Sequence, residues 1–218
     1  MYERVRIVGH GRVGTAAAAR LRERGVTVAD DRPHLVLVCV PDRAIADVAR
    51  SVEPGPWIAH VSGATPLAAL DPHVRRFGLH PLQTIVAWRG PEQLDGAWAA
   101  VTAETDEARA AARGLAGLLE LRPFDLADAD RVLYHAGAAF ASSFLVALHR
   151  TAASLFELAG APPEGLVPLM RRTIENRFEL TGPIERGDWA TVDAHLTALR
   201  ERAPHLEPLY RALAEAAA

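Results

Sequence analysis

The side chains best suited to proton transfer in this sequence are histidines at three defined places. His60 and His80 each end an apolar segment, while His135 lies in a run of small residues. The chain contains no lysine, so all 24 of its basic residues are arginine. Schiff-base chemistry and a P-loop lysine are therefore excluded. Because arginine stays protonated, proton transfer falls to His, Asp, Glu, Tyr or water.

A glycine-rich segment near the start has the spacing of a phosphate-binding turn. Gly9, Gly11 and Gly14 form a G-x-G-x-x-G pattern between a β-branched run, 5–8, and an Ala- and Arg-rich segment, 15–24. Strand, glycine turn and helix in this order are typical of a dinucleotide-binding unit. The three glycines would allow a tight turn, backbone approach to a pyrophosphate, and close helix–strand packing. The alternative is a glycine-rich turn that binds no ligand.

Residues at the ends of several predicted strands complete the expected site, because ligands bind beyond the carboxyl ends of parallel strands. The residues predicted to bind a cofactor are Gly9, His10, Gly11, Arg12, Val13, Gly14, Val40, Pro41 and Asp42. His60, Ser62, His80 and Gln83 are expected on the same rim. The alternative for each is a capped turn or a histidine bonded to nearby backbone.

Composition narrows the class of protein. The 218 residues are half hydrophobic and carry a formal net charge of −3, with acids and bases interspersed. This argues against a nucleic acid or a membrane surface as the main partner. We expect no signal peptide and no apolar run of membrane-spanning length. The single cysteine, Cys39, cannot form an internal disulfide, which favours the cytoplasm.

Two further kinds of chemistry find no support in the sequence. The nine histidines are scattered without metal-ligand spacing, and no pair of cysteines exists. No G-x-S-x-G elbow supports a serine hydrolase. We therefore expect no metal site.

Strands and helices alternate to about residue 125, which predicts a mostly parallel, doubly wound α/β sheet. From there the pattern is helical, with one long helix expected over Asp128–Ala159. The predicted organisation is a Rossmann-like dinucleotide-binding domain, 1–125, and an all-helical domain for substrate or dimerisation, 126–218. The apolar residues of the long helix lie on several sides, so part of it is expected to pack against a second subunit.

The connection between the second and third predicted strands is unusually short. Only Ala29 and the five residues Asp30–His34 separate Val26–Val28 from the apolar run Leu35–Val40. Parallel neighbours need a crossover of a dozen or more residues. Either the second strand is vestigial, or it sits low on the sheet and the chain crosses underneath. Both options remove the helix and strand that usually complete an adenosine pocket. We therefore favour an ordinary turn role for the Asp30 carboxylate over a contact with the adenosine ribose.

The helical part carries three polar residues of interest. His135 shares a helix face with small residues such as Ala138 and Ser142, so this face either packs closely on another helix or admits a flat ligand. Asn176 and Arg186 belong to polar segments further on. Arg186 is either an anion ligand or part of a turn whose side chains cap one another.

Several of these motifs together resemble a known family. They are Gly9–Thr15, Val40-Pro41-Asp42, His60–Ala64, Leu79–Thr84, Tyr134-His135-Ala136 and Leu180–Asp188. The chain resembles the Rossmann-like proteins with a C-terminal domain of unknown function, number 2520. It is more distantly similar to the 6-phosphogluconate dehydrogenase-like superfamily, which includes ketopantoate reductase and pyrroline-5-carboxylate reductase.

The resemblance implies an NADP-type cofactor at Gly9–Gly14 and a helical domain that builds the active site and often a homodimer. It implies no substrate. The chain departs from the pattern in the shortened junction Asp30–His34, which leaves the choice of NAD or NADP open, and in Ser143, where an asparagine is expected. Related reductases that depend on a lysine cannot lend their mechanism to this chain.

The hypothesis from sequence is a nicotinamide-dependent oxidoreductase for a small polar, anionic substrate. His135 is the expected proton donor, with His80 or His60 as alternatives. Ser62, Asn176 and Arg186 would position the substrate. The second hypothesis is a catalytically degenerate dinucleotide- or phosphate-binding protein with a regulatory or scaffold role, which the short junction favours. A third is a helical dimerisation module with an unliganded sheet.

Overall fold

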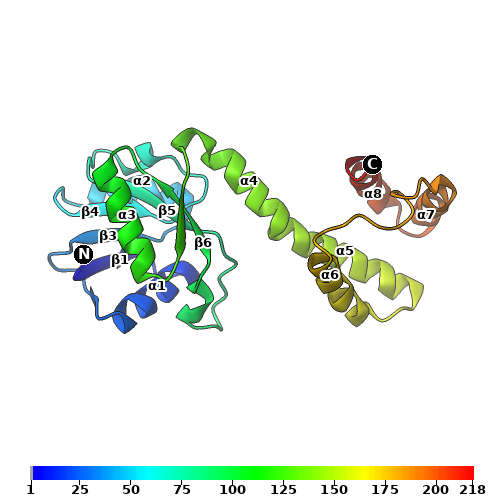
Figure 1. Ribbon diagram of the computed structural model, residues 1–218, viewed down its shortest axis with the longest axis horizontal. Coiled ribbons are helices and arrows are strands. Elements are labelled where there is room, and N and C mark those ends of the chain that lie inside the picture. Colours follow the sequence, from blue (N-terminus) through cyan, green and yellow to red (C-terminus); the bar gives the residue numbers. More distant parts are fainter. Residues whose placement is uncertain (1) are drawn as a thin grey trace. The chain divides into compact units, whose positions relative to one another are not determined.

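The protein, described here over residues 2–218 of a computed structural model, is built on one seven-stranded sheet (Figure 1). Its strands are β1 (Arg4–Val8), β2 (Thr27–Val28), β3 (Leu35–Val38), β4 (Trp57–His60), β5 (Arg76–Pro81), β6 (Trp98–Thr102) and β7 (Arg122–Asp125). They are ordered β2-β1-β3-β4-β5-β6-β7. Neighbours are parallel except β5 and β6. The predicted mostly parallel α/β sheet is confirmed.

Helices cover both faces of this sheet because its strand residues alternate between two cores. On one face, α1 (Arg12–Glu23) and α3 (Asp106–Leu118) bury their alanines and leucines against alternate strand residues such as Val5 and Leu37. On the other face, α2 (Ile45–Ser51) and the short helix η2 (Leu67–Leu70) pack on residues of opposite parity, such as Val36 and Ile58. The position of a residue in this alternation therefore shows which face of the sheet its side chain occupies.

The chain divides into two compact units, Met1–Ser142 and Ser143–Ala218. The first contains the sheet and α4 (Arg131–Ala141), and the second contains α5 (Ser143–Ala159), α6 (Leu166–Glu175), α7 (Trp189–Arg202) and α8 (Glu207–Ala216). The sequence predicts that the α/β pattern changes to an all-helical pattern between residues 125 and 126. The division of the structure into two units instead counts α4 with the sheet.

The long helix expected over Asp128–Ala159 is helical apart from one interruption at Ser142. There the backbone leaves helical geometry, with φ −125° and ψ −82°, and the Ser142 hydroxyl donates to the carbonyl of Ala138 at 2.7 Å. By length and composition alone this stretch could cross a membrane, since its most apolar 18-residue window has a mean hydropathy of 1.4. No residue of that window is buried. The expectation that no segment reaches membrane-spanning length is therefore wrong for the folded helix.

The short junction crosses the face of β1. Val28 and Leu35 lie on either side of Val5, so β2 ends three residues below the end of β1. Because Val5 faces the α1 core, Arg4 and Arg6 point to the opposite face. Asp31 pairs with Arg4 at 2.8 Å and Asp30 with Arg6 at 3.3 Å, which places the connection over that face.

This arrangement combines the two options that the sequence left open. The second strand is low on the sheet and is reduced to two residues. The crossing loop occupies the face of β1 where a crossover helix would otherwise lie. The acids at this junction are used in ion pairs with β1, so the usual wall of an adenosine pocket is absent from the described residues.

Candidate functional site

The three glycines of the first turn are required for different reasons. Gly9 has φ +102°, and a Cβ there would lie 2.6 Å from the Cys39 carbonyl oxygen. A Cβ on Gly14 would overlap the carbonyl oxygen of Gly9. Gly11 differs, because its φ of −71° suits any residue and a Cβ there would meet no atom within 4 Å. The fold explains Gly9 and Gly14, whereas Gly11 leaves open space beside the turn.

The start of α1 next to Gly11 has the features of an anion site. No side chain caps the first turn of this helix, and no acidic residue lies in it. Free backbone N–H groups and the helix dipole then favour a negatively charged ligand. His10 and Arg12 are both exposed beside the turn. The structure therefore offers here the cradle that a pyrophosphate needs.

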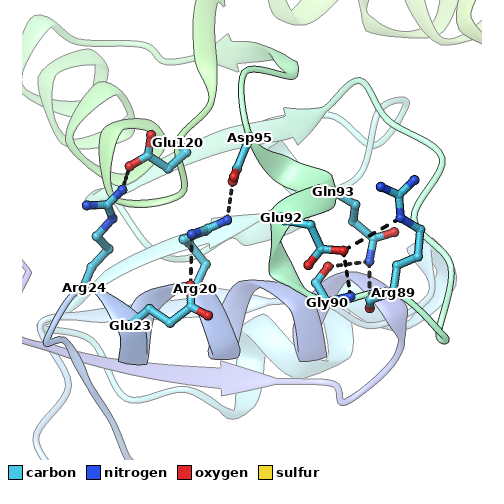
Figure 2. A network of polar contacts seen from close by, with 9 residues as sticks. All are labelled: Arg20, Glu23, Arg24, Arg89, Gly90, Glu92, Gln93, Asp95 and Glu120. Atoms are coloured by element: carbon cyan, nitrogen blue, oxygen red, sulfur yellow. Dashed lines mark hydrogen bonds and ion pairs between the residues drawn. The ribbon is translucent and has the colours of Figure 1, made fainter.

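A cavity of about 320 Å³ adjoins this turn and has a second wall formed by residues 86–91. Figure 2 shows how that wall is held. The buried Gln93 side chain donates to the carbonyls of Val86, Arg89 and Gly90, and its Oε1 accepts from Val86 N at 2.8 Å. Arg20 on α1 pairs with Asp95, and Arg24, directly after α1, pairs with Glu120. These ion pairs hold the adjacent segments of the same unit.

A larger cavity, of about 520 Å³, opens at the other end of the strands. Its lining includes Tyr2, Trp57 and Arg75, with the Arg75 guanidinium 4.7 Å from the Trp57 ring centroid. None of the predicted site residues lines it. Size alone therefore does not identify the site in this protein.

The three residues predicted to bind a cofactor beyond β3 have separate positions. Val40 packs against the α2 core, whereas Pro41 and Asp42 are exposed. Asp42 begins a 3-10 turn and accepts a hydrogen bond of 2.9 Å from the Ser62 hydroxyl. Asp42 thus links the end of β3 to the end of β4.

Ser62 organises the turn after β4. Its oxygen accepts from the backbone N–H groups of Ala64 and Thr65 at 3.2 and 2.9 Å, and it lies 2.9 Å from the Thr65 hydroxyl. With its donor on Asp42 and these acceptors filled, the Ser62 side chain is already satisfied within the protein. In this structure it has the role of a turn cap, which is the alternative that the sequence analysis held open.

A buried arginine lies over the middle of this sheet edge. His60, Gly78 and Thr102 stand in one row across β4, β5 and β6, so their side chains share a face. Arg131, which is fully buried, lies on this row and donates to Thr102 Oγ1 at 2.7 Å and to the Ser62 carbonyl. A Cβ on Gly78 would lie 2.8 Å from Arg131 Nη1, so the glycine makes room for the guanidinium.

His60 lies beside Arg131 and is also fully buried. Within the described part of the chain, neither of its ring nitrogens has a hydrogen-bond partner. Burial and then the charge of Arg131 lower the pKa of His60 to about 3. This imidazole is therefore neutral at pH 7 and is shut off from a substrate, which does not suit its suggested part as a proton donor.

Three aromatic side chains meet above this row. The Tyr134 hydroxyl lies 2.8 Å from His80 Nδ1, and the rings of His80 and His135 stand edge to face with centroids 5.8 Å apart. Gly63 allows the contact, because a Cβ there would overlap His135 and lie 3.0 Å from His80 Nε2. His80 is half-buried and His135 is exposed.

The pKa values of this group follow from burial. Burial, followed by the charges of His135 and Arg131, lowers the pKa of His80 to about 4. Burial raises the pKa of Tyr134 to about 12, and the charge of Arg131 opposes this. At pH 7, His80 is thus a neutral imidazole beside a protonated phenol.

Asn176 and Arg186 belong to the second unit and lie on its surface. Asn176 ends α6, where its N–H donates to the Arg172 carbonyl at 2.9 Å. Arg186 lies in the turn before α7, where Asp188 caps the helix by accepting from Thr191 N at 3.1 Å. The polar turn is therefore capped from within, and the substrate-binding roles of Asn176 and Arg186 stay predictions.

The sequence predicts His60, Ser62, His80 and Gln83 on one rim and singles out His135 on the long helix, but it does not identify Arg131 and Tyr134 as partners of this group. Two signals could have found them. Arg131 precedes His135 by four residues, which places both on one helix face. Gly78 lies inside a strand, where glycine often marks a close approach. Among residues 2–218, no group of three His, Cys, Asp or Glu side chains is arranged to hold a metal.

Comparison with known proteins places the chain in a family. Residues 97–217 match the family described as "Domain of unknown function (DUF2520)". The chain belongs to this family. That match covers more than half of the chain and confirms the resemblance read from its motifs. No curated protein matches the sequence.

Solved structures extend the likeness over the whole chain. The "putative NADP oxidoreductase BF3122" from Bacteroides fragilis is 21% identical, with a TM-score of 0.83, over 99% of this chain and 97% of that chain. Protein TM1727 from Thermotoga maritima is 23% identical, with a TM-score of 0.78, over 98% and 96%. A reductive aminase from Aspergillus terreus, in complex with NADPH and ethyl levulinate, is 18% identical, with a TM-score of 0.68, over 100% and 94%. At these identities the likeness shows a fold shared with dinucleotide-dependent oxidoreductases.

Proposed function

We propose that this protein is an NAD(P)-dependent oxidoreductase that acts on a small polar substrate. The observation that carries the proposal is Gly11. A ligand-free turn accounts for Gly9 and Gly14, whose Cβ atoms would clash, whereas Gly11 stands at the N-cap of α1 with ordinary φ and open space beside it. An N-cap position favours Ser, Asp or Asn at least as strongly as glycine. A pyrophosphate that must approach the backbone favours glycine in particular.

A nicotinamide held at this turn would supply hydride chemistry at a C=O or C=N carbon. The protein's own contribution lies at the ends of β4 and β5. His135 is exposed at this edge and is the proton donor in our proposal, with His80 directly behind it. Proton transfer to the developing alkoxide or amine fits the general acid role of histidine.

The alternative is a catalytically degenerate dinucleotide-binding protein with a regulatory or scaffold role. Its support is the junction 29–34, where Asp30 and Asp31 pair with β1 and no helix follows β2. Such a protein would bind ligand through the pyrophosphate alone. The aromatic group at His80 and His135 is the feature that this alternative leaves without a purpose.

Calorimetric titration with NADPH, NADH and ADP-ribose tests the proposal. We expect wild-type protein to bind all three and Gly11→Val to lose at least tenfold in affinity while unfolding at the same urea concentration. Gly117→Ala is the matched control, since that glycine also faces open space but lies in α3. Equal NADPH affinity in wild type and Gly11→Val would overturn the assignment. Binding of all three ligands without turnover across a panel of ketones and imines would favour the degenerate alternative.

We further propose that a second copy of the chain covers the apolar helices. Val132 and Leu133 on α4 are 68% and 77% exposed, and α5 has no buried residue. Exposed apolar area of this extent marks an interaction surface. A helix that is apolar on several sides needs cover on several sides.

Light scattering at micromolar concentration tests this assembly. We expect a dimer for the wild type and a monomer for Leu133→Glu. Val74→Glu serves as control, because Val74 is 88% exposed but lies outside these helices. A monomeric wild type, or wild-type protein that sediments with phosphatidylcholine–phosphatidylglycerol vesicles instead of dimerising, would contradict the proposal.

A further inference from the structure

We propose that Tyr134 is a positioning residue that fixes the tautomer of His80, so that the ring proton of His80 sits on Nε2 and faces Gly63 and His135. The inference rests on the proposed oxidoreductase function for its consequence, but its geometry stands on the contacts of the sheet edge. It adds a role for a residue of α4 that the sequence motifs left without one.

The first step is the anchoring of α4. Arg131 lies at the start of this helix and is fixed from two sides, by the Thr102 hydroxyl and by the Ser62 carbonyl. Asp128, just before the helix, accepts from Leu67 N at 3.0 Å. Tyr134 and His135 follow Arg131 by three and four residues, so they project from the same face one turn later. Their places above β5 are therefore set by the buried arginine.

The second step is the direction of the hydrogen bond. The oxygen of Tyr134 lies 2.8 Å from His80 Nδ1, and the bond can run either way. Among the hydrogen bonds of the described residues, the Tyr134 hydroxyl has no other acceptor for its proton. A phenol is also a stronger acid than a neutral imidazole N–H, so it is the better donor. The hydroxyl therefore donates, and Nδ1 is the unprotonated nitrogen.

The third step places the remaining proton. Because His80 is neutral at pH 7 and its Nδ1 accepts, its single ring proton is on Nε2. That nitrogen is 3.0 Å from the point where a Gly63 Cβ would stand, on the side where the His135 ring approaches. The groups whose charge acts on the ring are His135 and Arg131 on α4 and Asp42 beyond β3. His60 lies on the neighbouring strand β4.

The two histidines therefore have different roles in the proposed reaction. His80 donates a hydrogen bond from Nε2 to the oxygen or nitrogen of the substrate double bond but keeps its proton, since a neutral imidazole is a poor acid. His135 gives up the proton that this atom receives. A neutral imidazole that polarises a carbonyl is an established catalytic arrangement in other enzymes.

Nitrogen-15 spectra of the uniformly labelled protein test the tautomer directly, without substrate or cofactor. Two-bond correlations distinguish a protonated from an unprotonated ring nitrogen, and a His80→Asn sample identifies the signals. We expect wild-type His80 to show protonated Nε2 and unprotonated Nδ1 at pH 7. In Tyr134→Phe we expect Nδ1 to lose this signature and become a mixture of both forms, with unchanged signals for the His195 ring.

The outcomes separate the inference from the proposed function. Protonated Nδ1 in the wild type, or the same tautomer in Tyr134→Phe, would overturn the role of Tyr134 whatever the protein catalyses. Failure to bind NADPH with the expected tautomer present would instead count against the oxidoreductase assignment. His195 is the internal control because it makes a matching 2.8 Å contact with Tyr210 in the other unit.

Discussion

Gly63 and His135 touch so closely that a single methyl group on Gly63 would overlap the imidazole ring. The contact joins the turn after β4 to α4, and His80 lies against the same point. This close contact makes the identity of the glycine testable.

Gly63→Ala is therefore expected to lower the free energy of unfolding by about 1–3 kcal/mol, the usual cost of forcing extra volume into a packed contact. Urea denaturation measures this. Gly117→Ala, in α3 and facing open space, should be neutral or stabilising by up to about 1 kcal/mol. Equal stabilities of the two variants would show that α4 does not pack on this turn.

His60 gives a prediction about pH. Its pKa is about 3 in the folded protein and that of His80 is about 4, against about 6.5 in an unfolded chain. Below pH 6.5 the unfolded chain takes up protons that the folded protein does not, so acid favours unfolding. Stability should be fully present above pH 6.5 and should fall between pH 6.5 and 4, by an amount on the order of a few kcal/mol.

Replacement of His60 isolates its share of this effect. Since neither ring nitrogen has a partner among the described residues, His60→Leu should cost little at pH 7 and should flatten the loss of stability toward pH 4. His73→Leu is the contrasting variant, because His73 Nε2 makes a 2.9 Å hydrogen bond with the Ala49 carbonyl. That variant should lose about 1–3 kcal/mol. An unchanged acid transition in His60→Leu would contradict the burial of this imidazole.

Gln93 supports a third prediction, on the wall of the cavity beside the glycine turn. In Gln93→Ala the Val86 N–H loses its acceptor, and three carbonyls of residues 86–90 lose their donor. Hydrogen exchange at Val86 should accelerate at least tenfold, while amides in β1 keep their rates. Arg22→Ala, an exposed change on α1, is the control. Unchanged exchange at Val86 would mean that the loop is held by other contacts.

The sequence was sufficient for the sheet because its signals are local. Short β-branched runs, the glycine turn and the alternation with helices all report on neighbouring residues, and the structure confirms the α/β class. The residues that gather at the ends of the strands were only partly predicted. Ser62 follows β4 and His80 lies one residue before the end of β5, so the rule for parallel sheets places them. Arg131 is an arginine in a polar stretch, and nothing local shows that it is fully buried over Gly78.

His60 shows the opposite error. Its position at a strand end predicts an exposed, useful histidine, yet the residue is covered because α4 brings Arg131 over it. The extent of the long helix was predicted, but its interruption at Ser142 was not, since serine is an ordinary helix residue by propensity. For His60, a contact distant in sequence decides the outcome, whereas the break at Ser142 is accompanied by a local hydrogen bond to the Ala138 carbonyl.

The last prediction concerns the choice between NADH and NADPH. An acid after β2 usually meets the adenosine ribose, and a basic residue nearby accommodates a 2′-phosphate. Here Asp30 and Asp31 pair with Arg6 and Arg4 across β1, at 3.3 and 2.8 Å, and the strand before them has two residues. Neither acid is presented at the rim by a following helix.

Affinity should therefore depend on the pyrophosphate at α1, and the dissociation constants of NADH and NADPH should differ by less than about tenfold, or 1.4 kcal/mol. Asp30→Asn should change both constants by similar factors, because it alters an exposed ion pair with Arg6 and not a ribose contact. Calorimetry with both cofactors on both proteins measures this, with Asp47→Asn on α2 as a control for loss of one surface acid. A hundredfold preference in the wild type, or one that Asp30→Asn reverses, would show that a closed adenosine pocket forms when the cofactor binds.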